Sequence, residues 1–260
     1  MTLRIYLTGR MTIEAPGKLL DQDAFPAAQG LLAFARLVLD RHRAVSRDDL
    51  ASVLWAETLP RAWETSLSAI VSKLRTLLGK AGQKKSEVLS NALGCYQLNL
   101  PSDAWVDVEA AADGIHAAEG ARKARHHAKV FGPAHVAYQI ARRPFIAGED
   151  GPWVDGQREK LGTIFVRSCE CLADFYIWNG EPSLAVDSAM QVVAREPFRE
   201  TGYQLLMRAH AAAGNRAEAL WVYERCRKLI AEELGADPSP QTKAVHLAVL
   251  KTSRIKGKKS

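Results

Sequence analysis

The chain opens with residues that alternate between apolar and more polar side chains. Positions 3, 5 and 7 are Leu, Ile and Leu, and after the turn residues Gly9–Arg10 a second short run covers residues 11–14. A period of two places every second side chain on the same face of a strand. The sequence therefore predicts short antiparallel strands at the start of the chain.

Two stretches with helical spacing follow these strands. In the first, apolar residues recur at intervals of three and four from Ala27 to Arg41. In the second, Ser46 with Asp49 three positions later resembles an N-cap, and the residues up to Trp55 supply a short buried face. We expect two helices here, with Pro60 closing the loop that follows.

A third helix is predicted from about residue 61 or 63 to Leu78. Its apolar residues fall on a single stripe, which is the pattern of a helix with one buried face. The stripe consists of Leu67, Ile70, Val71, Leu74, Leu77 and Leu78. Gly79 is expected to be the C-cap, because glycine is the residue most often found there.

Two strand-like runs come next, Val88–Ser90 and Cys95–Leu100, with Asn91–Gly94 between them. Asn and Gly are typical of a hairpin turn. The order of strands, three helices and a hairpin is that of a winged helix-turn-helix domain. We assign this domain to residues 1–103, with Pro101 marking its end.

Beyond Trp105 the strand pattern disappears and helical spacing dominates. Several residues recur at an offset of 34 positions, which is the tetratricopeptide period. The matched pairs are Leu172 with Leu206, Gly180 with Gly214, Ala185 with Ala219, and Val186 with Leu220. We interpret the two glycines as turn residues, at points where a side chain would obstruct the packing of the paired helices.

The predicted fold class is therefore a two-domain protein. An α+β winged helix-turn-helix over residues 1–103 is followed by all-α, tetratricopeptide-like repeats over residues 104–250 and by a basic, disordered tail at residues 251–260. In the second domain the tryptophans are expected to pack between helices. They are Trp105, Trp153, Trp178 and Trp221.

The formal charge of +6 is unevenly distributed along the chain. Residues 61–85 contain six Lys or Arg and one acid, Glu64, and the tail contains five basic residues, whereas residues 104–250 contain 17 basic and 19 acidic residues. The positive charge is concentrated where a polyanion could meet it. Charge alone favours the alternative, a solvated helix face and a solubilising tail, especially for the tail.

The candidate chemistry does not favour an enzyme. The cysteines, Cys95, Cys169, Cys171 and Cys226, lack the paired spacing of a zinc site, and we expect them to be reduced and mostly buried. No phosphate loop, nucleophile elbow or paired-acid motif is present. We expect neither metal nor cofactor. Without a secretory signal or an apolar run of about 18 residues, we expect a cytoplasmic protein that does not bind a membrane.

Several motifs together carry a resemblance to a known family. They are Val45–Leu50 with Leu54–Trp55, Val71–Arg75, Gly94–Leu98, Glu196–Glu200, Leu206–Met207, Ala217–Leu220, Tyr223 and, most distinctive, Glu232–Pro240. In these the chain resembles the SARP-type activators, in which an OmpR-like winged helix precedes a bacterial transcriptional activator domain. One departure is the wing turn Asn91–Gly94, where family members often place a basic residue.

The resemblance implies a sequence-specific activator that binds direct repeats in promoter DNA as a homodimer and contacts RNA polymerase. By helix position and resemblance, the residues expected at double-stranded DNA are Thr65, Ser66, Ser68, Ala69, Ser72, Lys73, Arg75, Thr76, Lys84 and Lys85. Lys73 is expected in the major groove, and Arg75 either reaches a phosphate or braces the domain through an ion pair. The loop before the third helix resembles a polymerase-contact surface, with Glu57, Thr58, Leu59 and Arg61 as its candidate residues.

A second hypothesis belongs to a different class of function. If the winged helix had lost DNA binding, the repeats would make this chain a protein-interaction adaptor. The plain wing turn and the few basic residues on the third helix keep this alternative open. A titration against DNA separates the two hypotheses.

Overall fold

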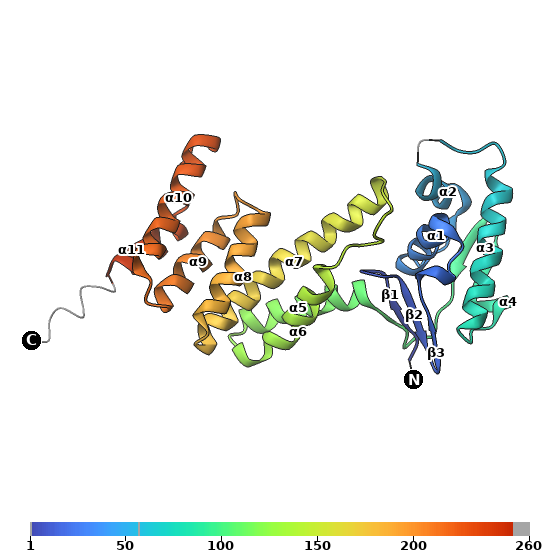
Figure 1. Cartoon of the computed structure of the whole chain (residues 1–260), viewed down its shortest axis with the longest axis horizontal. Coiled ribbons are helices and arrows are strands. Elements are labelled where there is room, and N and C mark those ends of the chain that lie inside the picture. The colour runs from blue at the N-terminus through green and yellow to red at the C-terminus, as the bar shows by residue number, and fades with distance from the viewer. Residues whose placement is uncertain (1, 57, 252–260) are drawn as a thin grey trace, which may run out of the picture. The chain divides into compact units, whose positions relative to one another are not determined.

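The computed structural model describes residues 2–56 and 58–251, and they form two compact units (Figure 1). The predicted tail contributes only Lys251, the last residue of the final helix. The rest of the tail, residues 252–260, lies outside the described residues.

Unit 1 is the chain up to Ala111 together with Ile140–Gly162. Its elements are β1 (Arg4–Tyr6), β2 (Thr12–Ala15), β3 (Lys18–Leu20), the 3-10 turn η1 (Gln22–Ala24), α1 (Ala27–Leu39), β4 (Val45–Ser46), α2 (Arg47–Trp55), α3 (Trp63–Lys80), α4 (Lys85–Val88), β5 (Leu89–Ala92), β6 (Cys95–Leu98) and β7 (Trp105–Val106). Helices α5 (Asp107–Lys123), α6 (Phe131–Ala141) and α7 (Pro152–Asn179) contribute residues to both units.

Unit 1 contains two small sheets. The first has the order β3-β2-β1-β7, with antiparallel pairs except for β7, which runs parallel to β1. Ile5, Leu7 and Ile13 are buried, so the alternating pattern is confirmed. The second sheet has the order β4-β6-β5 and carries the hairpin.

The three helices α1, α2 and α3 pack against one another, and α1 also contacts β6 of the second sheet. Ser46 caps α2 by accepting a hydrogen bond from the backbone N–H of Asp49 at 3.0 Å, as its sequence pattern predicts. The order of strands, three helices and hairpin is that of a winged helix, and the predicted fold class is confirmed for this part of the chain.

The expected role of Gly79 is wrong. Helix α3 continues through Gly79 to Lys80, and Ala81 is its C-cap. A Cβ at position 79 would meet the side chain of Lys85, with 2.5 Å to Cε. Gly79 therefore provides room for the first turn of α4 rather than ending α3, a packing requirement that local sequence does not reveal.

Unit 1 also extends beyond the expected boundary at residue 103. The carboxylate of Asp107 is fully buried and accepts hydrogen bonds from the backbone N–H groups of Leu7 and Thr8, both at 2.9 Å. The N–H of Gly9 donates to the carbonyl of Pro144 at 2.8 Å. Residues distant in sequence thus complete the edge of the first sheet, because its backbone groups need partners once they are buried.

Unit 2 comprises Ala112–Gln139 and the chain from Thr163 onward, and its described residues form helices and loops only. Besides its parts of α5, α6 and α7, it contains the 3-10 turn η2 (His127–Lys129), α8 (Pro182–Arg195), α9 (Glu200–Ala212), α10 (Arg216–Leu234) and α11 (Pro240–Lys251). Helix α9 packs against α8, α10 and α11. This is the predicted repeat architecture.

The repeat glycines lie in the turns where the 34-residue offset predicts them. The reason that these turns need glycine differs from the one expected, which was obstruction of helix packing by a side chain. Gly180 joins α7 to α8 and Gly214 joins α9 to α10, with φ of 77° and 79°. No atom lies within 4 Å of a Cβ built on either residue, so a side chain would not obstruct packing. The requirement is for the left-handed backbone conformation that glycine adopts without penalty.

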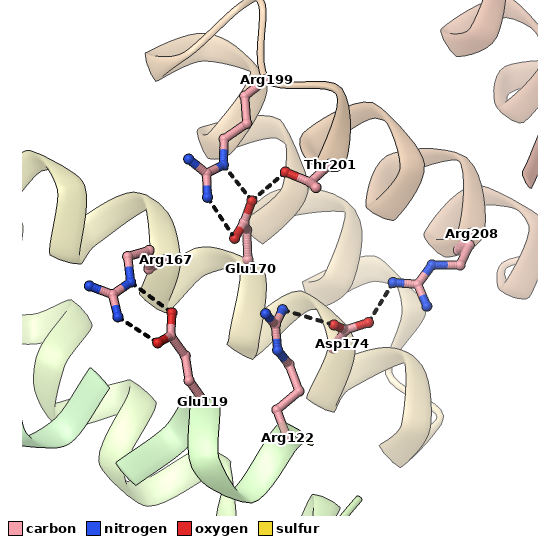
Figure 2. A network of polar contacts seen from close by, with 8 residues as sticks. All are labelled: Glu119, Arg122, Arg167, Glu170, Asp174, Arg199, Thr201 and Arg208. Atoms are coloured by element: carbon pink, nitrogen blue, oxygen red, sulfur yellow. Dashed lines mark hydrogen bonds and ion pairs between the residues drawn. The ribbon is translucent and has the colours of Figure 1, made fainter. Parts of the chain in front are cut away.

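A ladder of ion pairs crosses helices α5, α7 and α9 (Figure 2). Each of three carboxylates accepts hydrogen bonds from another segment of the unit. The pairs are Glu119 with Arg167 (2.7 Å), Glu170 with Arg199 (2.6 Å) and Thr201 (2.5 Å), and Asp174 with Arg122 (3.2 Å) and Arg208 (2.5 Å). Because the Glu170 side chain is only 7% exposed, these partners offset the cost of burying its charge.

Three of the cysteines are buried in unit 2, as expected. Burial raises the pKa of the Cys169 and Cys171 thiols to about 12 and that of Cys226 to about 11. Cys169 and Cys171 belong to different apolar clusters, so their side chains diverge. All three thus act as small apolar residues.

The expectation for the tryptophans is only partly correct. Trp105 packs its ring on Tyr6 at 5.3 Å and Trp153 lies near Phe145, and both pairs belong to unit 1. Trp178 and Trp221 in unit 2 are 52% and 57% exposed. Helical spacing identified the helices, but it did not show which positions another helix would cover.

Candidate nucleic-acid interface

Helix α3 presents one continuous exposed face within unit 1. Leu67, Val71 and Leu74 are buried against the domain, and this fixes which residues point outward. The exposed residues of α3 are Glu64 in its first turn and then Thr65, Ser68, Ala69, Ser72, Lys73, Thr76 and Lys80. Six of the predicted DNA-binding residues therefore share this face, whereas Ser66 is half-buried at its border.

Beyond Glu64 in the first turn, the α3 face is made of small side chains with two cations, Lys73 and Lys80. The hydroxyl of Ser68 donates to the carbonyl of Glu64 at 2.8 Å, and that of Thr76 donates to the carbonyl of Ser72 at 3.2 Å. Each hydroxyl oxygen retains lone pairs that can accept a hydrogen bond. The face therefore offers acceptors beside the exposed ammonium group of Lys73, and its small side chains permit close approach of another surface.

Arg75 does not share the outward face. Its side chain is half-buried, and its Nε donates a hydrogen bond to the carbonyl oxygen of Leu89 on β5 at 2.9 Å. Of the two alternatives for Arg75, the structure thus supports bracing of the domain, through a backbone carbonyl instead of an ion pair. Only a fold that brings β5 beside α3 reveals this partner.

Further lysines follow the end of α3. Lys84 is exposed and lies 3.5 Å from the carboxylate of Glu87, and Lys85 is exposed on α4. An exposed pair of this kind contributes at most about 1 kcal/mol, so both lysines remain available to another anion. Figure 1 shows α4 beside the C-terminal end of α3, and the loop from α2 at the other end.

The wing turn has two residues instead of the four that the sequence suggested. Strand β5 continues through Asn91 and Ala92, and the turn consists of Leu93 and Gly94 with φ of 52° and 75°. Positive φ at both central residues is the mark of a type I′ turn. The carbonyl of Gly94 accepts a hydrogen bond from the N–H of Arg47 at 3.1 Å, which ties the wing to the start of α2.

The loop between α2 and α3 is exposed at the described candidate residues, Thr58, Leu59 and Arg61. Glu57, the other residue assigned to the polymerase-contact surface, lies outside the described residues. Trp55 and Trp63 flank the loop and are half-buried.

Other kinds of site find no support in the described part of the chain. No group of three His, Cys, Asp or Glu is placed to hold a metal ion among residues 2–56 and 58–251. His127 instead stacks on Trp178 with ring centres 5.3 Å apart. None of the helices formed by those residues has the length and apolar character needed to cross a membrane.

Comparison with known proteins gives a family match over more than half of the chain. Residues 106–250 match the family described as bacterial transcriptional activator domain. The chain is 30% identical over 225 residues to the regulatory protein AfsR of Streptomyces coelicolor, covering 86% of this chain and 22% of AfsR. It is 29% identical over 232 residues to the transcriptional regulatory protein EmbR of Mycobacterium tuberculosis, covering 87% of this chain and 58% of EmbR.

The fold has a counterpart among solved structures. The structure of Mycobacterium tuberculosis EmbR in complex with a low affinity phosphopeptide matches with a TM-score of 0.80 and 26% identity, over 96% of this chain and 65% of that one. The chain thus spans only part of these relatives, from about a fifth to about two thirds of their length.

Proposed function

Because the chain belongs to the bacterial transcriptional activator domain family, with SARP-type regulators as its relatives, we propose that it activates transcription by binding promoter DNA through the exposed face of α3. The observation that carries this proposal is the composition of that face. From Thr65 to Lys80 its exposed side chains are small or belong to the two lysines, and the acidic residue of the face, Glu64, lies at its N-terminal end.

In the proposed complex, α3 lies in the major groove. Lys73 reaches a base edge or a phosphate, and the hydroxyl groups of Ser68 and Thr76 accept hydrogen bonds from base amino groups. Thr65, Ser72 and Ala69 line the same contact, with Ala69 as an apolar neighbour for a thymine methyl group. Lys84 and Lys85 add phosphate contacts at the end of the helix.

Arg75 acts indirectly in this proposal. Its hydrogen bond to Leu89 holds the wing hairpin at a fixed place relative to α3, so that both can meet the same duplex. Ser66, at the border of the face, adjoins the contact and does not reach a base. The loop that holds Thr58, Leu59 and Arg61 stays exposed at one end of α3, which suits it to contact RNA polymerase on the same promoter.

We further propose that two copies bind neighbouring direct repeats as a dimer on DNA. One winged helix covers few base pairs, and a second copy adds both affinity and discrimination. The likeness of the chain to named transcriptional regulators supports this arrangement in general terms.

The test is a fluorescence-anisotropy titration of the full chain against genomic promoter fragments and random duplexes. Specific binding with a log-log salt slope near −0.9 per neutralised phosphate is expected. Lys73→Ala should weaken specific binding by about 1 to 3 kcal/mol if Lys73 contacts a base. Lys18→Ala, which removes an exposed lysine of β3 outside the α3 face, is the matched control and should leave affinity unchanged.

The adaptor hypothesis predicts a different outcome of the same titration. It is favoured by one observation, the wing turn Leu93–Gly94, which offers no cation to the DNA backbone. If the folded chain shows no preference for any promoter fragment at low salt, sequence-specific DNA recognition is excluded. The adaptor hypothesis then replaces the proposed function.

A further inference from the structure

A groove in unit 2 is not used by the proposed function. It lies between α8 and α10, with α9 as its floor, and it has a volume of about 650 Å³. Buried apolar side chains such as Tyr203 and Leu206 form the floor, and Met190 and Trp221 stand on opposite walls with more than half of their surface exposed. Grooves of roughly 300 to 1,000 Å³ with apolar walls are typical of small-molecule sites.

The groove also contains a cation whose charge is not neutralised. Arg225 projects from α10, with its guanidinium 5.2 Å from the ring centre of Trp221. Burial raises the pKa of the Tyr203 phenol, and Arg225 acts in the opposite direction through its charge and a side-chain hydrogen bond. Within the described part of the chain, Arg225 forms an ion pair with no carboxylate.

The remaining charged groups of the groove either pair with one another or lie away from Arg225. Lys228 lies 3.8 Å from the carboxylate of Glu232, so these two form a pair at one end. Glu218 is seven positions before Arg225 on α10, which places it roughly 10 Å away along the helix axis. The middle of the groove therefore carries one net positive charge beside its apolar floor.

A buried polar atom beside the groove lacks a hydrogen-bond partner. Nδ1 of His210, on α9, is buried and makes no hydrogen bond with any described residue. A buried ring nitrogen without a partner costs about 1 to 3 kcal/mol. Because protein atoms already cover this nitrogen, the proposed ligand pairs with Arg225 and not with His210.

We propose that this groove binds a small organic carboxylate with an apolar body. The apolar body lies on Tyr203 and Leu206 between Met190 and Trp221, and the carboxylate pairs with Arg225. The guanidinium is suited to this role because it donates two parallel hydrogen bonds to a carboxylate. Since the groove is formed by three helices of unit 2, the ligand would stabilise their packing and give the regulator a site for an effector.

The test measures binding by isothermal titration calorimetry with the full chain. Octanoate and 1-naphthoate are the probes, and octan-1-ol is the uncharged counterpart of octanoate. Both carboxylates should bind, and octan-1-ol should bind at least about tenfold more weakly, because a hydrogen bond to a charged group contributes more than a neutral one.

Two charge-matched variants identify the site. Arg225→Gln should weaken octanoate binding about tenfold or more, to the level of octan-1-ol. Arg227→Gln removes an exposed arginine from the same helix, one that pairs with Glu224 outside the groove, and should leave binding unchanged. Both positions are exposed, so neither change should unfold the helix, which circular dichroism checks.

Two results would overturn the proposal. The first is that neither carboxylate binds at concentrations up to about 1 mM, the weak end of the affinity range for small ligands. The second is that Arg225→Gln binds octanoate as tightly as the unchanged chain. DNA binding is measured separately, so failure here leaves the proposed function of α3 untouched.

Discussion

The Nε of Arg75 on α3 donates a hydrogen bond to the carbonyl oxygen of Leu89 on β5, and this links the exposed helix to the wing. Arg75→Met, which keeps the length of the side chain but removes the donor, should lower the free energy of unfolding by about 1 to 3 kcal/mol, because the carbonyl loses its partner. Urea unfolding followed by circular dichroism measures this loss.

The same variant should also weaken promoter binding, because the wing is no longer held against α3. Arg61→Met is a suitable control for stability, since Arg61 is exposed in the loop before α3. If Arg75→Met loses DNA affinity with no change in the free energy of unfolding, then Arg75 contacts the DNA directly and does not act by bracing.

The length of DNA between half-sites should control cooperative binding. Two winged helices on the same face of a duplex require centres about 10 to 11 base pairs apart, one helical turn. Inserting about five base pairs between mapped half-sites should abolish cooperativity in a gel-shift titration, and inserting a full turn should restore part of it. Cooperativity that survives the half-turn insertion argues against a dimer on direct repeats.

The boundary of the DNA-binding unit can be tested with fragments. A fragment of residues 1–103 lacks β7 and Asp107, which leaves the N–H groups of Leu7 and Thr8 without their carboxylate partner. A fragment of residues 1–111 keeps them and should be more stable to urea by about 1 kcal/mol or more. Equal midpoints of unfolding would show that β7 and Asp107 contribute nothing to the stability of this unit.

DNA binding should be retained by whichever of these fragments is folded, and by the chain truncated after Leu250. A fragment of residues 104–250 should not bind specifically, because it lacks α3. Specific binding by that fragment in a gel shift would show that residues outside the winged helix recognise the DNA.

Asp107 should also produce a pH dependence of stability. Burial raises the pKa of its carboxyl above the ordinary value, although the N–H groups of Leu7, Thr8 and Val108 act in the opposite direction. A group with a raised pKa in the folded state contributes its full stabilisation below the unfolded pKa, about 4, and loses it as the pH rises through the folded pKa. The free energy of unfolding should therefore decline over this interval.

In Asp107→Asn this part of the decline should disappear, because the side chain no longer titrates. Asp113→Asn, an exposed position on the same helix, should keep the decline of the unchanged chain. Urea unfolding at a series of pH values measures both profiles. A profile of Asp107→Asn that is parallel to that of the unchanged chain would contradict the assignment.

The sequence by itself determined the fold class and most of the outward face of α3, with Ser66 and Arg75 as the exceptions. Local physics is sufficient for both: alternation specifies the strands, the spacing of Leu67, Val71 and Leu74 specifies the buried stripe, and Ser46 marks the start of α2 by its capping bond. The offset between Gly180 and Gly214 likewise located the repeat turns, since a left-handed backbone favours glycine wherever it occurs.

Only the tertiary structure decided which distant groups meet. The side chain of Arg75 donates a hydrogen bond to the carbonyl of Leu89, and that of Lys85 lies against Gly79. The carboxylate of Asp107 accepts hydrogen bonds from the N–H groups of Leu7 and Thr8. Such partners are separated by up to 100 residues. No local pattern encodes them, because a buried donor or acceptor is satisfied by whichever group the packing of the whole chain brings within hydrogen-bond distance.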